Sequence, residues 1–228
     1  MESLSIIQKI IIWAIPVLFA ITLHEVAHGY MAYRLGDGTA KFLGRLSLNP
    51  IRHVDPIGTL LIPALLLLMR SPVLFGWAKP VPINWHNLRK PHRDIALVAA
   101  AGPGANFIMA LFWGLFAKIG LWVNGPQLGS IALPIILMGA AGIAINTILM
   151  VLNLIPIPPL DGSRILTSLL PANLARTYNR IEPFGFFIVL ILLLTKVLYL
   201  IISPLYIGVT TLIYSLFDLP LSLHGLLF

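Results

Sequence analysis

An apolar segment that leads straight into a histidine motif constrains this chain more than any other feature. Residues 10–23 carry no charged side chain, and an H-E-x-x-H pentad follows at residues 24–28. Residues four apart lie on one face of a helix, so His24 and His28 can direct two imidazoles at one metal ion. Glu25 lies about 100° around the helix axis, where it can reach a water on that metal without binding the metal. The pattern is typical of the ligand pair and general base of zinc metallopeptidases.

The alternative is that the pentad is a chance or purely structural arrangement of two histidines on a membrane helix. The chain contains only six histidines and eight acidic residues, so chance rarely produces this spacing. Ionisable side chains at membrane depth are costly and are functional by default. We therefore favour a metal site.

The composition predicts an integral membrane protein. Hydrophobic residues make up 58% of the 228 residues and charged residues only 10%, which is not the composition of a soluble domain. The net charge of +7 comes from basic residues in short segments between apolar runs. That distribution indicates membrane orientation and not nucleic-acid binding. The chain has no cysteine, so a metal site must use histidine and carboxylate ligands.

The lengths of the apolar runs predict an all-α polytopic membrane protein with about 4–6 transmembrane helices and short membrane-associated β or loop segments. The runs expected to span as helices cover residues 5–33, 94–123 and 131–154. Asn106, within the second run, is expected to join neighbouring helices. Residues 57–69 are short for a span, which favours a re-entrant or partly spanning element. We expect one domain over residues 1–228, with its core at about 5–170. The membrane segments at about 184–217 are one span plus a short second one, or two short ones.

Two segments are expected to be non-helical. Residues 37–56 are polar and contain an Asn-Pro and an Asp-Pro pair, which favours loop and short strand. Prolines at alternate positions exclude a helix in residues 75–84 and suit an extended edge segment. Basic side chains place the loops 34–56 and 156–183 in the cytoplasm, and the uncharged connection 124–130 is placed outside.

The end of the predicted span at residues 131–154 brings more polar residues to membrane depth. Residues 153–162 read N-L-I-P-I-P-P-L-D-G. The three prolines end the helix and favour an extended backbone, which a membrane protein tolerates only where it lines a cavity or is buried. Asp161 either ligates the metal or caps a helix that starts near Ser163. We favour ligation because the two histidines lack a third ligand. Asn153 either donates a hydrogen bond to substrate or packs between helices.

Taken together, these motifs resemble those of the site-2 protease family of intramembrane zinc metalloproteases, in its compact branch without a PDZ or CBS domain. The stretches that carry the resemblance lie at residues 24–28, 101–106 and 153–162, with further similarity at 44–50, 55–59 and 75–82. The resemblance implies one zinc ion per chain on His24, His28 and Asp161. It also implies Glu25 as the base and Asn153 near the scissile peptide.

The resemblance further implies hydrolysis of peptide bonds in or near the transmembrane segments of membrane-protein substrates, as in regulated intramembrane proteolysis. It implies a prokaryotic cell membrane, with the active site facing the cytoplasm. The expected partners are a transmembrane protein or peptide substrate and membrane lipid, with no nucleic acid, and the sequence does not indicate an oligomeric state. One alternative is a cation transporter that uses the same buried groups, but it needs further ionisable residues on other spans. The other is a non-catalytic scaffold, which has no need of Glu25.

Overall fold

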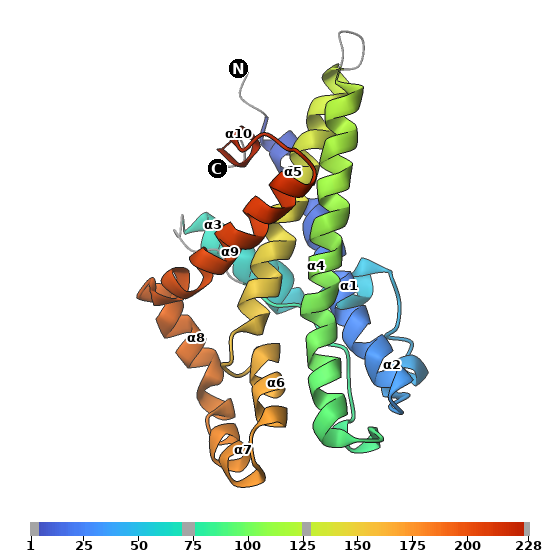
Figure 1. Cartoon of the computed structure of the whole chain (residues 1–228), viewed down its shortest axis with the longest axis vertical. Coiled ribbons are helices and arrows are strands. Elements are labelled where there is room, and N and C mark those ends of the chain that lie inside the picture. Colours follow the sequence, from blue (N-terminus) through green and yellow to red (C-terminus); the bar gives the residue numbers. More distant parts are fainter. Residues whose placement is uncertain (1–4, 70–75, 125–128, 226–228) are drawn as a thin grey trace.

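The computed structural model describes residues 5–69, 76–124 and 129–225, and within these ranges it contains helices and no strand (Figure 1). In chain order the elements are α1 Ile6–Arg34, α2 Thr39–Phe42, η1 Pro50–His53, η2 Pro56–Leu61, α3 Ile62–Leu68, η3 Trp85–Asn87, α4 Pro91–Val123, α5 Gly129–Leu154, α6 Asp161–Leu169, α7 Ala172–Asn179, η4 Glu182–Phe184, α8 Gly185–Leu194, α9 Val197–Leu216 and α10 Ser222–Gly225. The all-α prediction is confirmed.

Five stretches are long and apolar enough to cross a membrane, which agrees with the expected number of spans. They are Ile7–Arg34, Pro91–Val123, Ala132–Leu154, Ala172–Leu194 and Val197–Leu216. The last two resolve the C-terminal alternatives: one stretch combines α7 and α8, and α9 forms the other. The chain is therefore a polytopic integral membrane protein.

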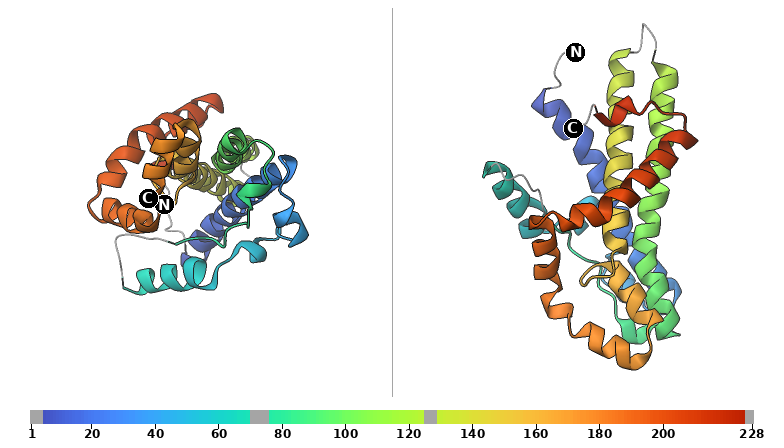
Figure 2. Two further views of the ribbon diagram at one scale, coloured as in Figure 1. Left: turned by 90° about the horizontal axis from the view of Figure 1, so that it is seen from below. Right: turned by 60° about the vertical axis from the view of Figure 1, so that its left-hand side comes forward.

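The helices α1, α4 and α5 form the centre of the molecule (Figures 1 and 2). Small residues let α4 and α5 lie side by side, because a Cβ added to Gly139 would lie only 2.6 Å from the Cβ of Ala117. The largest apolar core includes Trp113 of α4, Ile143 of α5 and Ile213 of α9. This close packing fixes the helices that flank the pentad.

The predicted ends of the long helices are close to the observed ones, and the main difference is at the start of α4. The helix begins at Pro91 and not at Asp94, because proline suits the first turn of a helix. In addition, the Asp94 carboxylate accepts a hydrogen bond from the Lys90 N–H at 2.8 Å. Local capping therefore extends α4 by one turn at its basic end.

The short strand expected within residues 37–56 does not form. The segment instead contains α2 and η1, and the Asn49 side chain accepts a hydrogen bond from the Ile51 N–H at 3.1 Å where η1 begins. Such side-chain contacts to nearby backbone favour turns over strands. Residues 57–69 fold into η2 and α3, which are together too short to be counted among the spans. This agrees with a partly spanning element.

The basic connections lie at one end of the molecule. In Figure 1 the α6–α7 region and the start of α4 lie at the bottom, whereas the end of α4 and the start of α5 lie at the top. Residues 125–128 of the predicted external connection lie outside the described residues. The basic residues of the α6–α7 region and of the start of α4 thus lie at the opposite end of the molecule from where α4 ends and α5 starts. The assignment of the basic end to the cytoplasm stays a prediction.

Candidate metal centre

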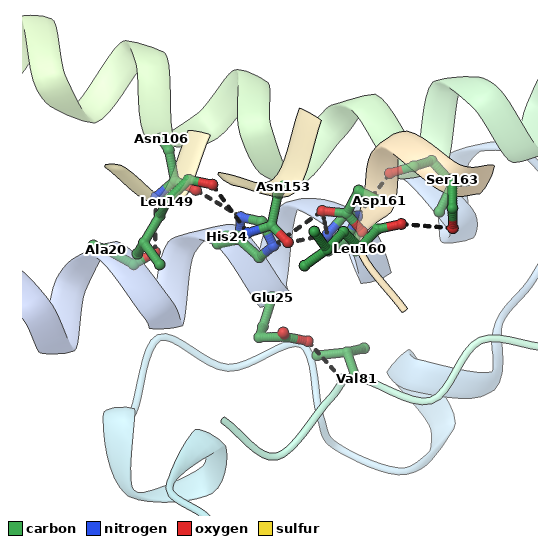
Figure 3. Close-up of polar contacts among 12 residues, drawn as sticks. Ala20, His24, Glu25, Val81, Asn106, Leu149, Asn153, Leu160, Asp161 and Ser163 are labelled. Atoms are coloured by element: carbon green, nitrogen blue, oxygen red, sulfur yellow. Dashed lines mark hydrogen bonds and ion pairs between the residues drawn. The ribbon is translucent and has the colours of Figure 1, made fainter. Parts of the chain in front are cut away.

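Three predicted ligands from two distant parts of the chain converge beside α1. The Nε2 atoms of His24 and His28 lie 3.1 Å apart on successive turns of the helix. The Oδ2 atom of Asp161 lies 3.3 Å from the first and 3.2 Å from the second. All three side chains are largely buried. The folded chain therefore collects two imidazoles and one carboxylate at a single point (Figure 3).

The aspartate arrives from a set of turns and not from the extended backbone that we expected. Residues 155–160 form bends and turns between α5 and α6, because the restricted φ of proline suits turns as well as extended chain. Asp161 is the first residue of α6, Leu160 is the N-cap, and no side chain caps this helix. The alternative in which Asp161 caps a helix is therefore wrong. Gly162 has no room for a Cβ, which would lie 2.6 Å from the Ile155 oxygen, so glycine is needed beside the aspartate.

The helix α4 supports both histidines from behind with residues at a matching spacing. The Nδ1 atom of His28 lies 2.7 Å from the Val98 carbonyl oxygen, and that of His24 lies 2.6 Å from Asn106 Oδ1. Gly102 lies between these two partners, one turn from each. A Cβ at Gly102 would lie 2.6 Å from His24 Cε1 and would also overlap the His28 ring. The imidazoles therefore rest directly on the backbone of α4.

These contacts determine which ring nitrogen of each histidine carries the proton. The Val98 carbonyl can only accept a hydrogen bond, so His28 donates from Nδ1 and its Nε2 keeps a lone pair. Asn106 Oδ1 has the same effect on His24. Asp161 Oδ2 is buried and has no hydrogen-bond partner among the described residues. Three acceptor atoms thus face one another without a proton between them, an arrangement that fits a bound zinc ion.

Glu25 follows His24 and so lies about 100° around α1 from it, where it meets residues 76–84, which we call the strap. Figure 3 shows its carboxylate turned toward Val81, and the Val81 N–H donates a hydrogen bond to Glu25 Oε2 at 2.8 Å. The strap is non-helical, as its alternate prolines predicted, but it pairs with no strand within the described part of the chain. The pentad therefore contacts the ligand cluster through its histidines and the strap through Glu25.

One edge of the strap is fastened to the protein through its odd-numbered residues. The Trp77 N–H donates to the Gly58 oxygen at 3.1 Å and the Lys79 N–H to the His53 oxygen at 3.0 Å. The Val81 N–H, bound to Glu25, points in the same direction as these two because alternate residues of extended chain share an edge. The strap is thus held by its backbone at regular intervals.

Asp37 anchors the far end of the strap. This fully buried carboxylate accepts hydrogen bonds from the Asn84 N–H at 2.9 Å, the Asn87 side-chain amide at 2.9 Å and the Thr39 N–H at 3.2 Å. Burial alone would raise the pKa of Asp37, but a hydrogen bond from the Thr39 hydroxyl and the three named above outweigh burial and lower it below its ordinary value. A charged Asp37 therefore joins the end of α1 to the strap.

Asn153 lies near the cluster but makes its observed contact within its own helix. Its side-chain amide donates to the Leu149 oxygen of α5 at 3.0 Å. Figure 3 shows the side chain beside the His24 ring, on the same side as Asp161. The contact agrees with a packing role, and the predicted contact with substrate stays a prediction.

Sequence reasoning missed the supporting role of α4. Asn106 joins helices as expected, but it also contacts His24, and neither the Val98 carbonyl nor Gly102 was identified as a partner of the histidines. The available signal was spacing, because residues 98, 102 and 106 recur every four residues, as His24 and His28 do. Two antiparallel helices with matching four-residue repeats can place each pair of residues in register.

The sequence of this chain is similar to a peptidase family and to proteins named as zinc metalloproteases. The profile of peptidase family M50 matches residues 127–195, which include the aspartate segment. The protein named "Putative zinc metalloprotease YwhC" of Bacillus subtilis is 40% identical over 182 residues, 79% of this chain and 79% of that protein. "Putative zinc metalloprotease Rip2" of Mycolicibacterium smegmatis is 30% identical over 189 residues, 79% of this chain and 66% of that protein. Its namesake in Mycobacterium tuberculosis is 31% identical over 213 residues, 92% of this chain and 74% of that protein. No solved structure matches the chain significantly.

Proposed function

This chain belongs to peptidase family M50, the site-2 protease family, as a zinc metalloprotease, and we propose that it cleaves peptide bonds in or near the transmembrane segments of other membrane proteins. The observation that carries the proposal is the convergence of His24, His28 and Asp161 beside Glu25 on a span-length apolar helix. A site in such a helix can act only on a substrate that reaches it within or at the edge of the membrane.

In this proposal His24, His28 and Asp161 hold one zinc ion per chain. Bound zinc supplies a water of lowered pKa and polarises the peptide carbonyl. Glu25 accepts the proton from the attacking water, for which the adjacent position on α1 suits it. The Val81 N–H engages one carboxylate oxygen of Glu25 and orients the group. Asn153 donates its side-chain amide to the substrate backbone near the scissile bond.

The strap offers a surface on which an unwound substrate segment can lie. Its odd-numbered residues face the protein, so Ala78, Pro80 and Pro82 form the opposite edge. The backbone groups of Ala78 and Pro82 make no hydrogen bonds within the described part of the chain. Prolines lack an N–H, and this edge therefore presents mainly carbonyl acceptors. The Pro80 carbonyl already accepts a hydrogen bond from the Arg45 guanidinium at 3.3 Å. We propose that substrate N–H groups pair with the carbonyls of Ala78 and Pro82, which holds the peptide extended beside the metal.

We further propose that residues 1–228 act as one domain, with the catalytic core at about 5–170, and that the site opens toward the cytoplasm. The excess of basic residues at the α6–α7 end supports this orientation. Many large apolar side chains of the outer helices are exposed, which supports contact of these helices with membrane lipid.

The alternative functions fit the molecule less well. A cation transporter needs ionisable groups along a continuous path, whereas α5 and α9 contain no Asp, Glu, Lys, Arg or His. A non-catalytic scaffold would not need a carboxylate held beside the metal ligands. The peptidase assignment therefore accounts for the buried polar groups most completely.

The proposal is tested with Glu25→Gln in purified protein and a model transmembrane substrate. We expect the variant to keep its zinc and its fold and to lose cleavage, because the amide cannot take up a proton. His24→Ala is the contrasting variant, and we expect it to lose zinc as well as cleavage. Cleavage by Glu25→Gln at the wild-type rate would show that Glu25 is not the base.

A further inference from the structure

A chain of buried amides lies behind His24 and plays no part in the proposed chemistry. Asn106 of α4 and Asn146 of α5 are both fully buried. Asn106 Oδ1 lies 2.6 Å from His24 Nδ1, and Asn106 Nδ2 lies 3.2 Å from the Ala20 oxygen and 3.0 Å from Asn146 Oδ1. Asn146 Nδ2 lies 2.9 Å from the Gly142 oxygen. The amides thus connect His24 to the backbone of two other helical turns.

The carbonyl partners of Asn106 and Asn146 can only accept hydrogen bonds, and this determines which atom donates in each hydrogen bond of the two amides. The Gly142 carbonyl only accepts, so Asn146 must turn its NH₂ group there and its oxygen toward Asn106. The Ala20 carbonyl also only accepts, so the NH₂ group of Asn106 serves Ala20 and Asn146. The oxygen of Asn106 is left facing His24, and it can only accept from Nδ1–H. The two amides therefore keep the proton on Nδ1 and leave the lone pair on Nε2.

We propose that Asn106 and Asn146 are positioning residues that hold His24 in the ring orientation and tautomer required for metal binding. The inference rests on the proposed role of His24 as a zinc ligand. Asn146 is two hydrogen bonds from the imidazole and still acts on it, because it determines which way the Asn106 amide faces. If Asn106 turned over, its NH₂ group would face Nδ1, the proton would move to Nε2, and the lone pair that points at the metal would be lost.

The two histidines differ in the groups that hold their rings in place. His28 donates to a backbone carbonyl, which no side-chain substitution removes, whereas His24 depends on two side chains. Partners of this kind behind a metal ligand commonly change metal affinity about 10–100-fold when removed. The affinity for zinc should accordingly be sensitive to Asn106 and Asn146.

A purely structural role makes a different prediction. If the amides only join α1, α4 and α5, their loss lowers thermal stability and leaves the zinc affinity of the folded protein unchanged. A neighbouring residue provides the matched control. Thr147 is fully buried on α5, and its hydroxyl has no hydrogen-bond partner among the described residues. Thr147→Val keeps the shape of the side chain and does not touch the amide chain.

The experiment measures the zinc dissociation constant of the purified full-length protein in detergent by competition with a chromophoric chelator. We expect Asn106→Leu to weaken zinc binding about 10–100-fold, and Asn146→Leu to weaken it by a smaller factor. Thr147→Val should bind zinc as the wild type does. Asn106→Asp keeps an oxygen that can accept from His24 Nδ1–H, and it should retain most of the affinity. The visible absorption of bound Co²⁺ should change in the Leu variants and not in the control.

Wild-type zinc affinity and an unchanged Co²⁺ spectrum in both Leu variants would overturn the proposal and leave a structural role. If Asn106→Leu does not fold, the comparison of Asn146→Leu with Thr147→Val decides the question alone. The outcome is separable from the proposed function: wild-type protein without zinc would refute the ligand set, whereas failure of the positioning role leaves zinc binding by the wild type and the loss of cleavage in Glu25→Gln intact.

Discussion

The two sides of α1 around the pentad are held in different ways. On the α4 side, His24 and His28 rest on Gly102 and donate to groups buried between packed helices. On the strap side, Glu25 contacts a non-helical segment whose Trp77 side chain is 42% exposed. Contacts of the first kind suit the proposed metal site, because they hold the ligands rigidly. Contacts of the second kind can be exchanged for contacts with the proposed substrate. Substitutions on the two sides of α1 are therefore expected to change metal affinity and substrate handling separately.

The largest effect is expected on the α4 side, from Gly102→Ala. The added methyl group would overlap both imidazoles, and the backbone of α4 cannot move away because α4 is packed against α5. We expect zinc affinity to fall more than about 100-fold and cleavage to be lost. Zinc content and cleavage are measured on the same preparation.

Gly104→Ala is the matched control for this substitution. A Cβ at Gly104 meets no atom within 4 Å, so the variant should bind zinc normally and cleave normally. Equal zinc binding by Gly102→Ala and Gly104→Ala would show that the close contact between α4 and the histidines does not limit the metal site.

A smaller and different effect is expected on the strap side, from Gly58→Ala. A Cβ there would overlap the Trp77 indole, so Trp77 and the strap must shift. Misplacing a substrate by about 1 Å can cost up to about 100-fold in rate. We expect slower cleavage with unchanged zinc affinity. Cleavage is measured as kcat/KM, and bound zinc is measured on the same preparation. Gly208→Ala on α9, where a Cβ also meets nothing within 4 Å, is the control. Loss of zinc in Gly58→Ala would contradict the independence of the two sides.

The smallest effect is expected from the substrate. A helical substrate must unwind before it can lie along the strap, and residues that destabilise helices lower that work. Glycine in a helix costs about 1 kcal/mol relative to alanine, which corresponds to roughly fivefold in rate. Replacing a glycine near the cut of a model substrate by leucine should therefore slow cleavage severalfold without any change in the enzyme. Equally fast cleavage of the stiffened substrate would show that unwinding does not limit the reaction.

The sequence allowed the spans and the candidate ligands to be predicted because both depend on local patterns. Apolar length located α1, α4 and α5, and the i, i+4 spacing of His24 and His28 holds on any helix. The turns at residues 155–160 and the short helices near residue 50 were not predicted, because proline and asparagine suit several backbone shapes and tertiary contacts select among them. The supporting role of Asn106 depends on how α4 is rotated against α1, and no local pattern specifies that rotation.

The alternate prolines of the strap also bear on how copies of the protein behave beside one another in a crowded membrane. Extended segments with a free edge tend to pair with the same edge of another copy and so begin aggregation. Here Pro80 and Pro82 remove the donors, and two such edges brought together would oppose carbonyl to carbonyl. In the proposed function the strap accepts a substrate segment that brings its own N–H groups, whereas pairing with the strap of another copy is disfavoured. The prolines thereby disfavour self-association through the same surface that we propose for substrate.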